Sequence, residues 1–155
     1  MSRRTLLVGA AVAVVALAVG FLVLRTTRDD DPFASYCDEV VAQRDKLGAA
    51  LSAGAETGLI RALPSFQALE RKSPDDIRQD WRLVVARISD LEDALAAAGV
   101  DAASYDRARP PAGLSAAKKD AIDAAAARLG SQETNTALRR VDQQARDVCK
   151  TPLSL

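Results

Sequence analysis

The segment SPDDIRQDWRLVVARISDLEDALAAAG, residues 73–99, decides the fold. It opens with helix start signals, because Ser73 can act as an N-cap, Pro74 suits the first helical position and two aspartates follow in the first turn. Gly99 is a typical C-terminal stop. Apolar residues recur between these signals at heptad spacing: Ile77, Trp81, Val84, Ile88, Leu91, Leu95 and Ala98. The pattern predicts one long helix with a continuous apolar seam.

This apolar seam needs a partner surface, which is either other helices of the same chain or a second copy of the chain. Other segments of the chain are also amphipathic, so we expect an intramolecular bundle and a monomer. Trp81 should belong to the core of that bundle. Its large apolar area and single N–H group suit a helix interface that provides one polar partner.

A first helix is predicted ahead of this segment, from Phe33 to about Ala53. Its apolar stripe consists of Phe33, Cys37, Val40, Leu47 and Leu51. Arg44 interrupts the stripe. A charged side chain at such a position usually reaches the rim of the interface or pairs with a carboxylate, so we expect a structural role for it.

A second, shorter helix is predicted over residues 59–72. It follows a turn bracketed by Gly54 and Gly58, and Pro64 should restart or kink it. Its apolar set is Leu59, Ile60, Leu63, Phe66 and Leu69.

Two more helices are predicted toward the C-terminus. Ser115 is the expected N-cap of one that runs to Leu129, with Ile122 and Leu129 as its apolar anchors. After Gly130 a last helix ends at Cys149, and it should direct four residues inward: Leu138, Val141, Ala145 and Val148. The composition is poor in aromatic residues, at 4%. We therefore predict an all-α fold, an antiparallel bundle of four to five helices over residues 33–150, followed by a C-terminal tail, 151–155.

The N-terminal sequence predicts a membrane anchor. Residues 5–24, TLLVGAAVAVVALAVGFLVL, are uninterrupted and apolar, and about twenty such residues let a helix cross a bilayer. The one clear small-x-small cleavage site, Ala16 to Ala18, lies inside the run, so we expect a retained signal-anchor, with secretion after cleavage as the alternative. Residues 1–4 would be a cytoplasmic tail and residues 25–32 a linker. The opening SRRTLL also resembles a twin-arginine signal, which leaves the export route open.

The cysteines favour an extracytoplasmic location for the bundle. Cys37 and Cys149 are the two cysteines of the chain, and neither belongs to a CxxC pair, which disfavours a zinc site or a redox motif. A disulfide between them is the natural interpretation, and disulfides persist in oxidising compartments. The alternative is two separate buried thiols.

Charge and missing residue types disfavour several functions. All 21 acidic residues and 17 of the 21 basic residues follow residue 28, which gives that part a formal charge of −4 and argues against nucleic-acid binding. The chain has no histidine, which excludes Ser-His and Cys-His nucleophile pairs and histidine-bound metals. Neither a nucleophile elbow nor a nucleotide-binding glycine motif occurs. We expect no enzyme activity, no metal and no cofactor.

The connection from Gly99 to Leu114 is the candidate interaction loop. Connections of this length inside compact domains are often functional. The residues of interest are Tyr105, Asp106, Arg107 and Arg109. The alternative is a crossover that only changes the direction of the chain.

With these landmarks the chain resembles a group of uncharacterised actinobacterial envelope proteins. The likeness is carried by the Tyr36-Cys37-Asp38 start, the Pro74-x-x-Ile77-x-x-Asp80-Trp81 helix entry and the Ala-rich closing helices that end at Cys149. The resemblance implies an exported, signal-anchored small helical protein. It implies no catalytic residue and no ligand.

Two functions are compatible with these features. The first, which we favour, is a membrane-tethered interaction module that presents a helix face or the loop to another envelope protein or to the cell wall. The alternative is a helical carrier with an apolar ligand cavity lined by Trp81, Phe66 and their neighbours. An exposed apolar patch would favour the first function and an enclosed pocket the second.

Overall fold

The computed structural model describes residues 31–153, which form five α-helices and no strand. The helices are α2 (Ala34–Leu51), α3 (Ala55–Lys72), α4 (Arg78–Ala98), α5 (Ala116–Leu129) and α6 (Gln132–Cys149). The all-α prediction is confirmed. From Ser35 onward the described residues form one compact unit.

The predicted membrane anchor, residues 5–24, lies outside the described residues. Within residues 31–153, none of the helices is both long enough and apolar enough to span a membrane.

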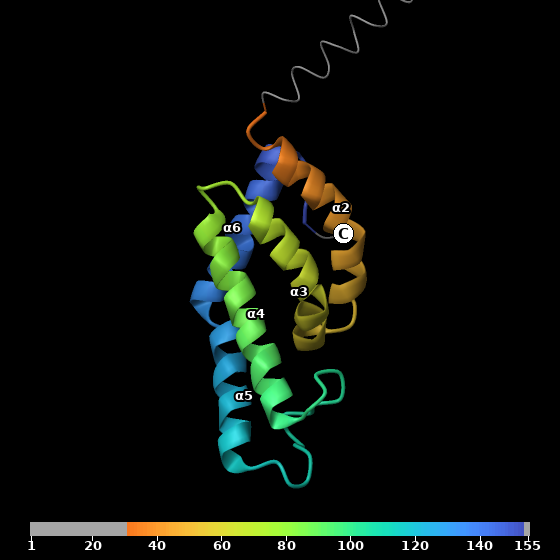
Figure 1. Cartoon of the computed structure of the whole chain (residues 1–155), viewed down its shortest axis with the longest axis vertical. Helices are drawn as coiled ribbons and strands as arrows, with labels where there is room; N and C mark the ends of the chain where they lie inside the picture. The colour runs from red at the N-terminus through yellow and green to blue at the C-terminus, as the bar shows by residue number, and fades with distance from the viewer. Residues whose placement is uncertain (1–30, 154–155) are drawn as a thin grey trace, which may run out of the picture. The chain divides into compact units, whose positions relative to one another are not determined.

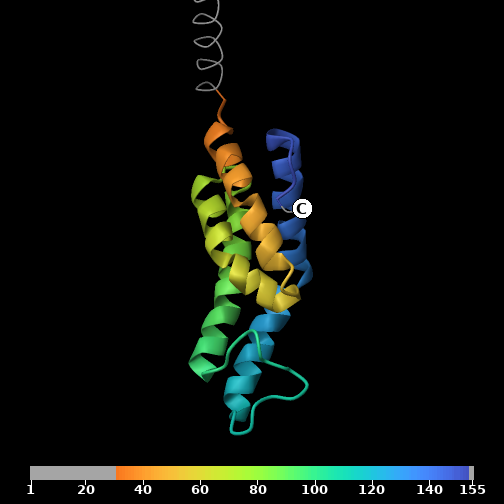
Figure 2. The same cartoon turned by 90° about the vertical axis from the view of Figure 1, so that its right-hand side faces the viewer.

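Helix α4 is the centre of the bundle and packs against α3, α5 and α6. Consecutive helices α2, α3 and α4 alternate in direction, and α5 runs back along α4 (Figures 1 and 2). Helix α6 does not fold back beside α5 as another antiparallel neighbour. The two follow one another in the same direction along α4, with Gly130 and Ser131 at their junction (Figure 1). A disulfide links α2 to α6 across the bundle.

The apolar seam of α4 forms the core, as predicted. Its members from Ile77 to Leu95 are all buried, and only Ala98, at the end of the helix, is partly exposed. They pack with apolar residues of the other helices of the same chain, including Leu69, Ile122 and Val141. The seam is therefore filled from within the chain.

The predicted start of the α4 helix was wrong. Ser73 is the C-cap of α3, where its hydroxyl donates to the Glu70 carbonyl at 2.7 Å. The next residues form a separate turn closed by a hydrogen bond from the Ile77 N–H to the Pro74 carbonyl, and α4 begins at Arg78. Serine favours both roles because its hydroxyl can bond either to a free N–H or to a free carbonyl. The predicted stop is confirmed, since Gly99 takes the left-handed conformation with φ 72°.

Helix α3 begins four residues earlier than predicted, directly after Gly54, whose φ of 105° favours glycine. Pro64 lies inside the helix on its exposed side and does not end it. Gly58 is part of the helix rather than of a turn. A Cβ atom there would lie 2.9 Å from the Leu51 Cα, so this glycine permits the close approach of α3 to the end of α2.

Helix α2 buries a residue that the sequence stripe omitted. Tyr36 is 1% exposed, and Val40 and Leu47 are buried beside it. Of the other predicted stripe residues, Cys37 and Leu51 are partly buried and Phe33 precedes the helix. Arg44 is half-buried, and its Nε atom has no hydrogen-bond partner among the described residues. The polar contact between α2 and α3 is made instead by Ser65, whose hydroxyl donates to the Gln43 side-chain carbonyl at 2.9 Å.

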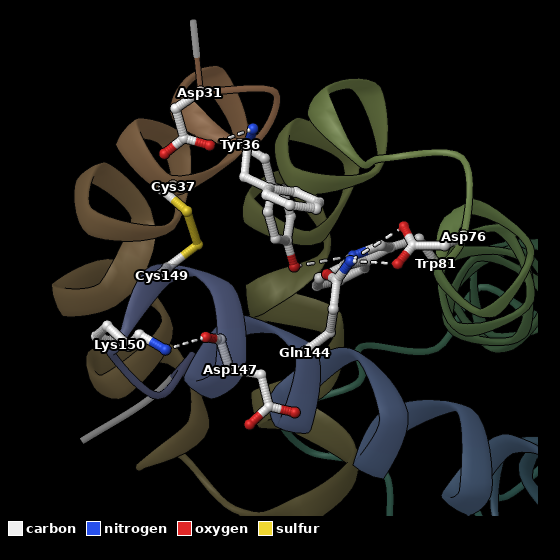
Figure 3. The surroundings of a disulfide bond; sticks show 10 residues. Asp31, Tyr36, Cys37, Asp76, Trp81, Gln144, Asp147, Cys149 and Lys150 are labelled. Carbon is white, nitrogen blue, oxygen red and sulfur yellow. Dashed lines mark hydrogen bonds between the residues drawn. A yellow bond between two sulfur atoms is a disulfide. The ribbon is translucent and has the colours of Figure 1, made fainter. Parts of the chain in front are cut away.

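Cys37 and Cys149 form the predicted disulfide, with their Cα atoms 5.1 Å apart. Figure 3 shows the bond joining the start of α2 to the end of α6, next to the buried Tyr36. The Trp81 Nε1 group donates to the Tyr36 hydroxyl at 3.2 Å, so α2 is tied to α4 as well as to α6. Trp81 thus has the single polar partner that its indole requires.

The predicted cap at Ser115 is confirmed, and Ser131 caps the last helix in the same way. The Ser115 hydroxyl accepts from the Lys118 N–H, and the Ser131 hydroxyl accepts from the Thr134 N–H. Beyond α6 the predicted tail turns back onto the bundle: Leu153 is buried, and its N–H donates to Asp142 at 3.2 Å.

Candidate functional site

The candidate interaction loop joins the end of α4 to the start of α5. It has no helix of its own and lies at the opposite end of the bundle from the disulfide (Figures 1 and 2). Its start is fixed by the C-cap of α4, where the Val100 N–H donates to the Leu95 carbonyl at 3.0 Å.

Two aspartates order the backbone of the loop. The Asp101 carboxylate accepts from the Ala103 N–H at 2.8 Å, and the Asp106 carboxylate accepts from the Ala108 N–H at 2.8 Å. Asp106 also pairs with Arg109 at 2.9 Å. Hydrogen bonds from Arg109 and from the backbone lower the pKa of Asp106. Each aspartate therefore closes a local turn, which is a typical use of this residue in loops.

Asp123 of α5 fastens the middle of the loop to the bundle. Its carboxylate pairs with Arg107 of the loop at 2.7 Å and also accepts a short hydrogen bond from Lys119, one turn earlier on α5. These partners, Lys119 first and Arg107 second, lower the pKa of Asp123. The same contact with Asp123 raises the pKa of Lys119. The loop is thus held by a charge network of three residues.

Tyr105 turns from the loop toward the bundle and borders a cavity of about 310 Å³ between α3, α4, α5 and the loop. The cavity is lined by Gly54, Thr57, Ile60, Leu91, Leu95, Ala102, Tyr105 and Ile122. The Tyr105 hydroxyl is buried and has no hydrogen-bond partner among the described residues.

The four predicted loop residues therefore have different environments. Tyr105 faces the bundle, and Asp106 and Arg107 are engaged in ion pairs. Arg109 pairs with Asp106 while its side chain stays 88% exposed. Sequence reasoning missed Asp123 and Lys119, although their spacing of four residues is a recognisable helix ion-pair pattern.

Trp81 and Phe66, which we expected to line a ligand cavity in a carrier, are packed in the core of the described bundle. Trp81 is fully buried, and its ring centroid lies 5.9 Å from that of Phe66. Neither residue lines the cavity described above. The cavity at the loop end is partly open and borders Tyr105 and Thr57 as well as aliphatic side chains.

No three His, Cys, Asp or Glu side chains within residues 31–153 come together in a way that could hold a metal ion. Comparisons of the chain with protein-family models, curated proteins and solved structures find no match. The fold and the site define a disulfide-closed helical bundle with an ordered loop and a cavity at the end remote from the disulfide.

Proposed function

We propose that this protein is a membrane-tethered, extracytoplasmic interaction module of the bacterial cell envelope, and that residues 99–114 are its recognition surface. The role is binding rather than catalysis, and the partner is another envelope protein. The observation that carries the proposal is the ordering of the loop: Asp101, Asp106 and Asp123 hold it through hydrogen bonds and ion pairs. An ordered loop loses less conformational freedom on binding than a disordered one.

The position of the loop supports this role. The bundle is joined to the predicted anchor through the start of α2, at the disulfide end. The loop lies at the other end, beyond α4, whose 21 residues extend about 32 Å. Recognition residues would then be remote from the point of attachment.

The exposed side chains of the loop give the recognition surface its chemistry. Arg109, Pro110 and Pro111 form an exposed run. Arginine is enriched at protein interfaces and pairs with carboxylates. Exposed large apolar side chains are scarce among the described residues, where Val41 is the one example at 66% exposure. Recognition by the loop would therefore rest on polar and charged contacts, and not on the exposed apolar patch that we expected to favour an interaction module.

Site-specific photo-crosslinking tests the proposal. A photoreactive amino acid placed at Arg109 in the full chain, in its native membrane, should give a discrete adduct with one partner protein. The matched control is the same amino acid at Val41, which is exposed on α2, and it should give no such adduct. Asp123→Asn should reduce the Arg109 adduct because it releases the loop. Equal adducts from both positions, or adducts with cell-wall material alone, would contradict the proposal.

The proposed location has its own test. A reporter that is active only in the cytoplasm, fused after Leu155, should be silent, and alkaline carbonate should leave the protein in the membrane fraction. Strong reporter activity would place the bundle in the cytoplasm and refute the location.

A further inference from the structure

Within the loop, Arg109, Pro110 and Pro111 form a short segment that we call the proline arm. All three residues are exposed, and the two prolines belong to no helix. Each proline ring fixes its own φ near −65°, and a residue that precedes a proline is restricted to extended backbone. Because Arg109 and Pro110 both precede a proline, the sequence favours the polyproline II conformation along the arm.

Two turns hold the ends of the proline arm. Before the prolines, the Arg109 N–H donates to the Asp106 carbonyl at 3.0 Å. After them, the Leu114 N–H donates to the Pro111 carbonyl at 3.2 Å. Gly113 lies in this second turn with a φ of 91°, a conformation that favours glycine. The arm is therefore an ordered projection that is fixed at both ends.

The backbone and the rings of the arm offer two kinds of contact to a partner. The two proline rings are a small exposed apolar surface. The carbonyls of Arg109 and Pro110 accept no hydrogen bond from any residue within 31–153, so they can accept one from a partner. A groove lined by Trp and Tyr side chains has the matching chemistry, because each of these side chains combines an apolar ring with an N–H or O–H donor.

Arg109 adds a contact for a carboxylate. Its Nε group donates to Asp106 at 2.9 Å, while its two terminal amino groups have no partner within residues 31–153. These two groups can form paired hydrogen bonds with a carboxylate of the partner. The bond to Asp106 also holds the guanidinium in place, which reduces the side-chain freedom lost on binding.

From these features we propose that the proline arm is the binding element of the loop, and that its partner is an envelope protein with an aromatic-lined groove bordered by a carboxylate. The proline rings pack against the aromatic side chains, the free carbonyls accept from their N–H and O–H groups, and Arg109 pairs with the carboxylate. Polyproline II segments suit such grooves because little conformational freedom remains to be lost. This inference rests on the proposed function and names the chemistry of the partner.

Photo-crosslinking of the full chain in isolated native membranes tests the arm, with the photoreactive amino acid at Ala112. This exposed position leaves Arg109 and both prolines in place. Pro110→Ala together with Pro111→Ala should lower the yield of the partner adduct by about fivefold or more, because two fixed φ angles and both rings are lost. Pro64→Ala is the matched control and should leave the yield unchanged, since Pro64 is also exposed but lies inside α3.

A soluble polyproline peptide is the direct probe of the groove. A groove that accepts the arm should also accept this peptide, which should suppress the wild-type adduct in a saturable manner. A Gly-Ser peptide of the same length should not suppress it. Arg109→Ala should lower the adduct yield severalfold, because the contact with the carboxylate is lost.

The outcomes separate this inference from the proposed function. An adduct that persists undiminished in the double proline variant, with the bundle intact by circular dichroism, would overturn the role of the arm and leave the loop as the recognition surface. An adduct that the polyproline peptide does not suppress would overturn the aromatic groove. The absence of a discrete protein adduct from both Arg109 and Ala112 would overturn this inference together with the proposed function.

Discussion

The two ends of the bundle each bury a tyrosine hydroxyl, and they do so differently. At the disulfide end Tyr36 is fully enclosed and accepts a hydrogen bond from Trp81, beside the Cys37 to Cys149 bond (Figure 3). At the loop end Tyr105 borders a cavity and has no hydrogen-bond partner among the described residues. One end is closed by a covalent bond and dense packing, and the other by surface ion pairs.

This difference indicates how stability and function are divided along the bundle. Dense apolar packing and a disulfide favour a single arrangement, which is what the end joined to the predicted anchor needs. At the loop end the ion pairs and turns hold exposed side chains in fixed positions, which reduces the conformational freedom lost when a partner binds. The proposed recognition surface lies at the loop end for this reason.

Removing the disulfide should cause the largest loss of stability, and the loss should begin at the disulfide end. The bond closes a separation of 112 residues, and Cys37→Ala together with Cys149→Ala should lower the free energy of unfolding by about 4–5 kcal/mol. Urea unfolding of the oxidised wild-type chain and of the double variant measures the change. The amides near Tyr36 should lose hydrogen-exchange protection first, before those of the loop. An equal loss of hydrogen-exchange protection at both ends would contradict the assignment of stability to the disulfide end.

Truncation of the α4 seam should have the next largest effect. Ile88→Ala should cost about 2–5 kcal/mol because the side chain is fully buried. Leu91→Ala should fall in the lower part of that range, since Leu91 already borders the cavity and loses fewer contacts. Glu92→Ala, at an exposed position, should change stability by less than about 0.5 kcal/mol.

Two results would contradict this interpretation of the seam. The first is a larger loss for Leu91→Ala than for Ile88→Ala, which would mean that the loop end is packed as tightly as the middle of the bundle. The second is a wild-type dimer that dissociates in Leu91→Ala by sedimentation, which would make the seam intermolecular. Asp90, also on α4, would be a poorer control than Glu92, because its carboxylate lies within 4 Å of both Arg87 and Arg128.

The elements of the fold could be predicted from sequence because their signals are local. Heptad spacing gave the α4 seam, and Gly99, Ser115 and Gly130 gave three helix ends. The prediction that Ser73 starts a helix was wrong because a serine hydroxyl can cap either the start or the end of a helix. Only the separate turn from Pro74 to Ile77 shows that Ser73 ends α3. The start of α3 was predicted too late because Gly58 is typical of a turn in the sequence. In the fold, Gly58 lies inside α3 and allows its close approach to the end of α2.

The candidate site could be predicted only in part for a different reason. The loop was identified by its length and its residues, but the inward position of Tyr105 depends on contacts with three helices distant in sequence. The same limitation applied to Tyr36, which was omitted from the predicted stripe of α2 although it is the hydrogen-bond partner of Trp81. Which end of the bundle is densely packed depends on how side-chain volumes fit together, and periodicity does not determine that.

Alkaline pH should weaken the disulfide end selectively. Burial raises the pKa of Tyr36 to about 12, and its hydrogen bond with Trp81 offsets only part of that effect. The unfolded chain releases the phenol proton near pH 10, so the folded state binds more protons between these values. The resulting stabilisation is complete below pH 10 and is lost as the pH rises toward 12.

Urea unfolding between about pH 9 and pH 11.5 should therefore show a loss of about 2 kcal/mol that depends on Tyr36. Lys119, whose pKa is also raised, contributes in the same direction. The decisive quantity is thus the difference between wild type and Tyr36→Phe, which should shrink over this pH range. A difference that stays constant would mean that Tyr36 is not held in its protonated form by the fold.

The smallest effect should be confined to the loop end. Asp123→Asn removes the carboxylate that pairs with Arg107 and Lys119, and hydrogen exchange of the amides from 101 to 109 should accelerate severalfold while global unfolding changes little. Asp142→Asn is the matched control, because Asp142 also pairs with a basic residue four positions away, Arg146, but near the other end. Asp142→Asn should leave the hydrogen-exchange rates of the loop amides unchanged.

Acid should reproduce the Asp123→Asn effect in the wild-type chain. The paired cations lower the pKa of Asp123 from its ordinary value of 3.8, so the pairing is fully present above that value and is lost as the pH falls through the lowered pKa. Loop protection, corrected for the pH dependence of chemical exchange, should therefore fall in the wild type at acid pH and change little in Asp123→Asn, where this pairing is already gone. If the variant loses protection in acid as strongly as the wild type, the loop is held by its own turns at Asp101 and Asp106. The charge network would then not be what distinguishes the two ends.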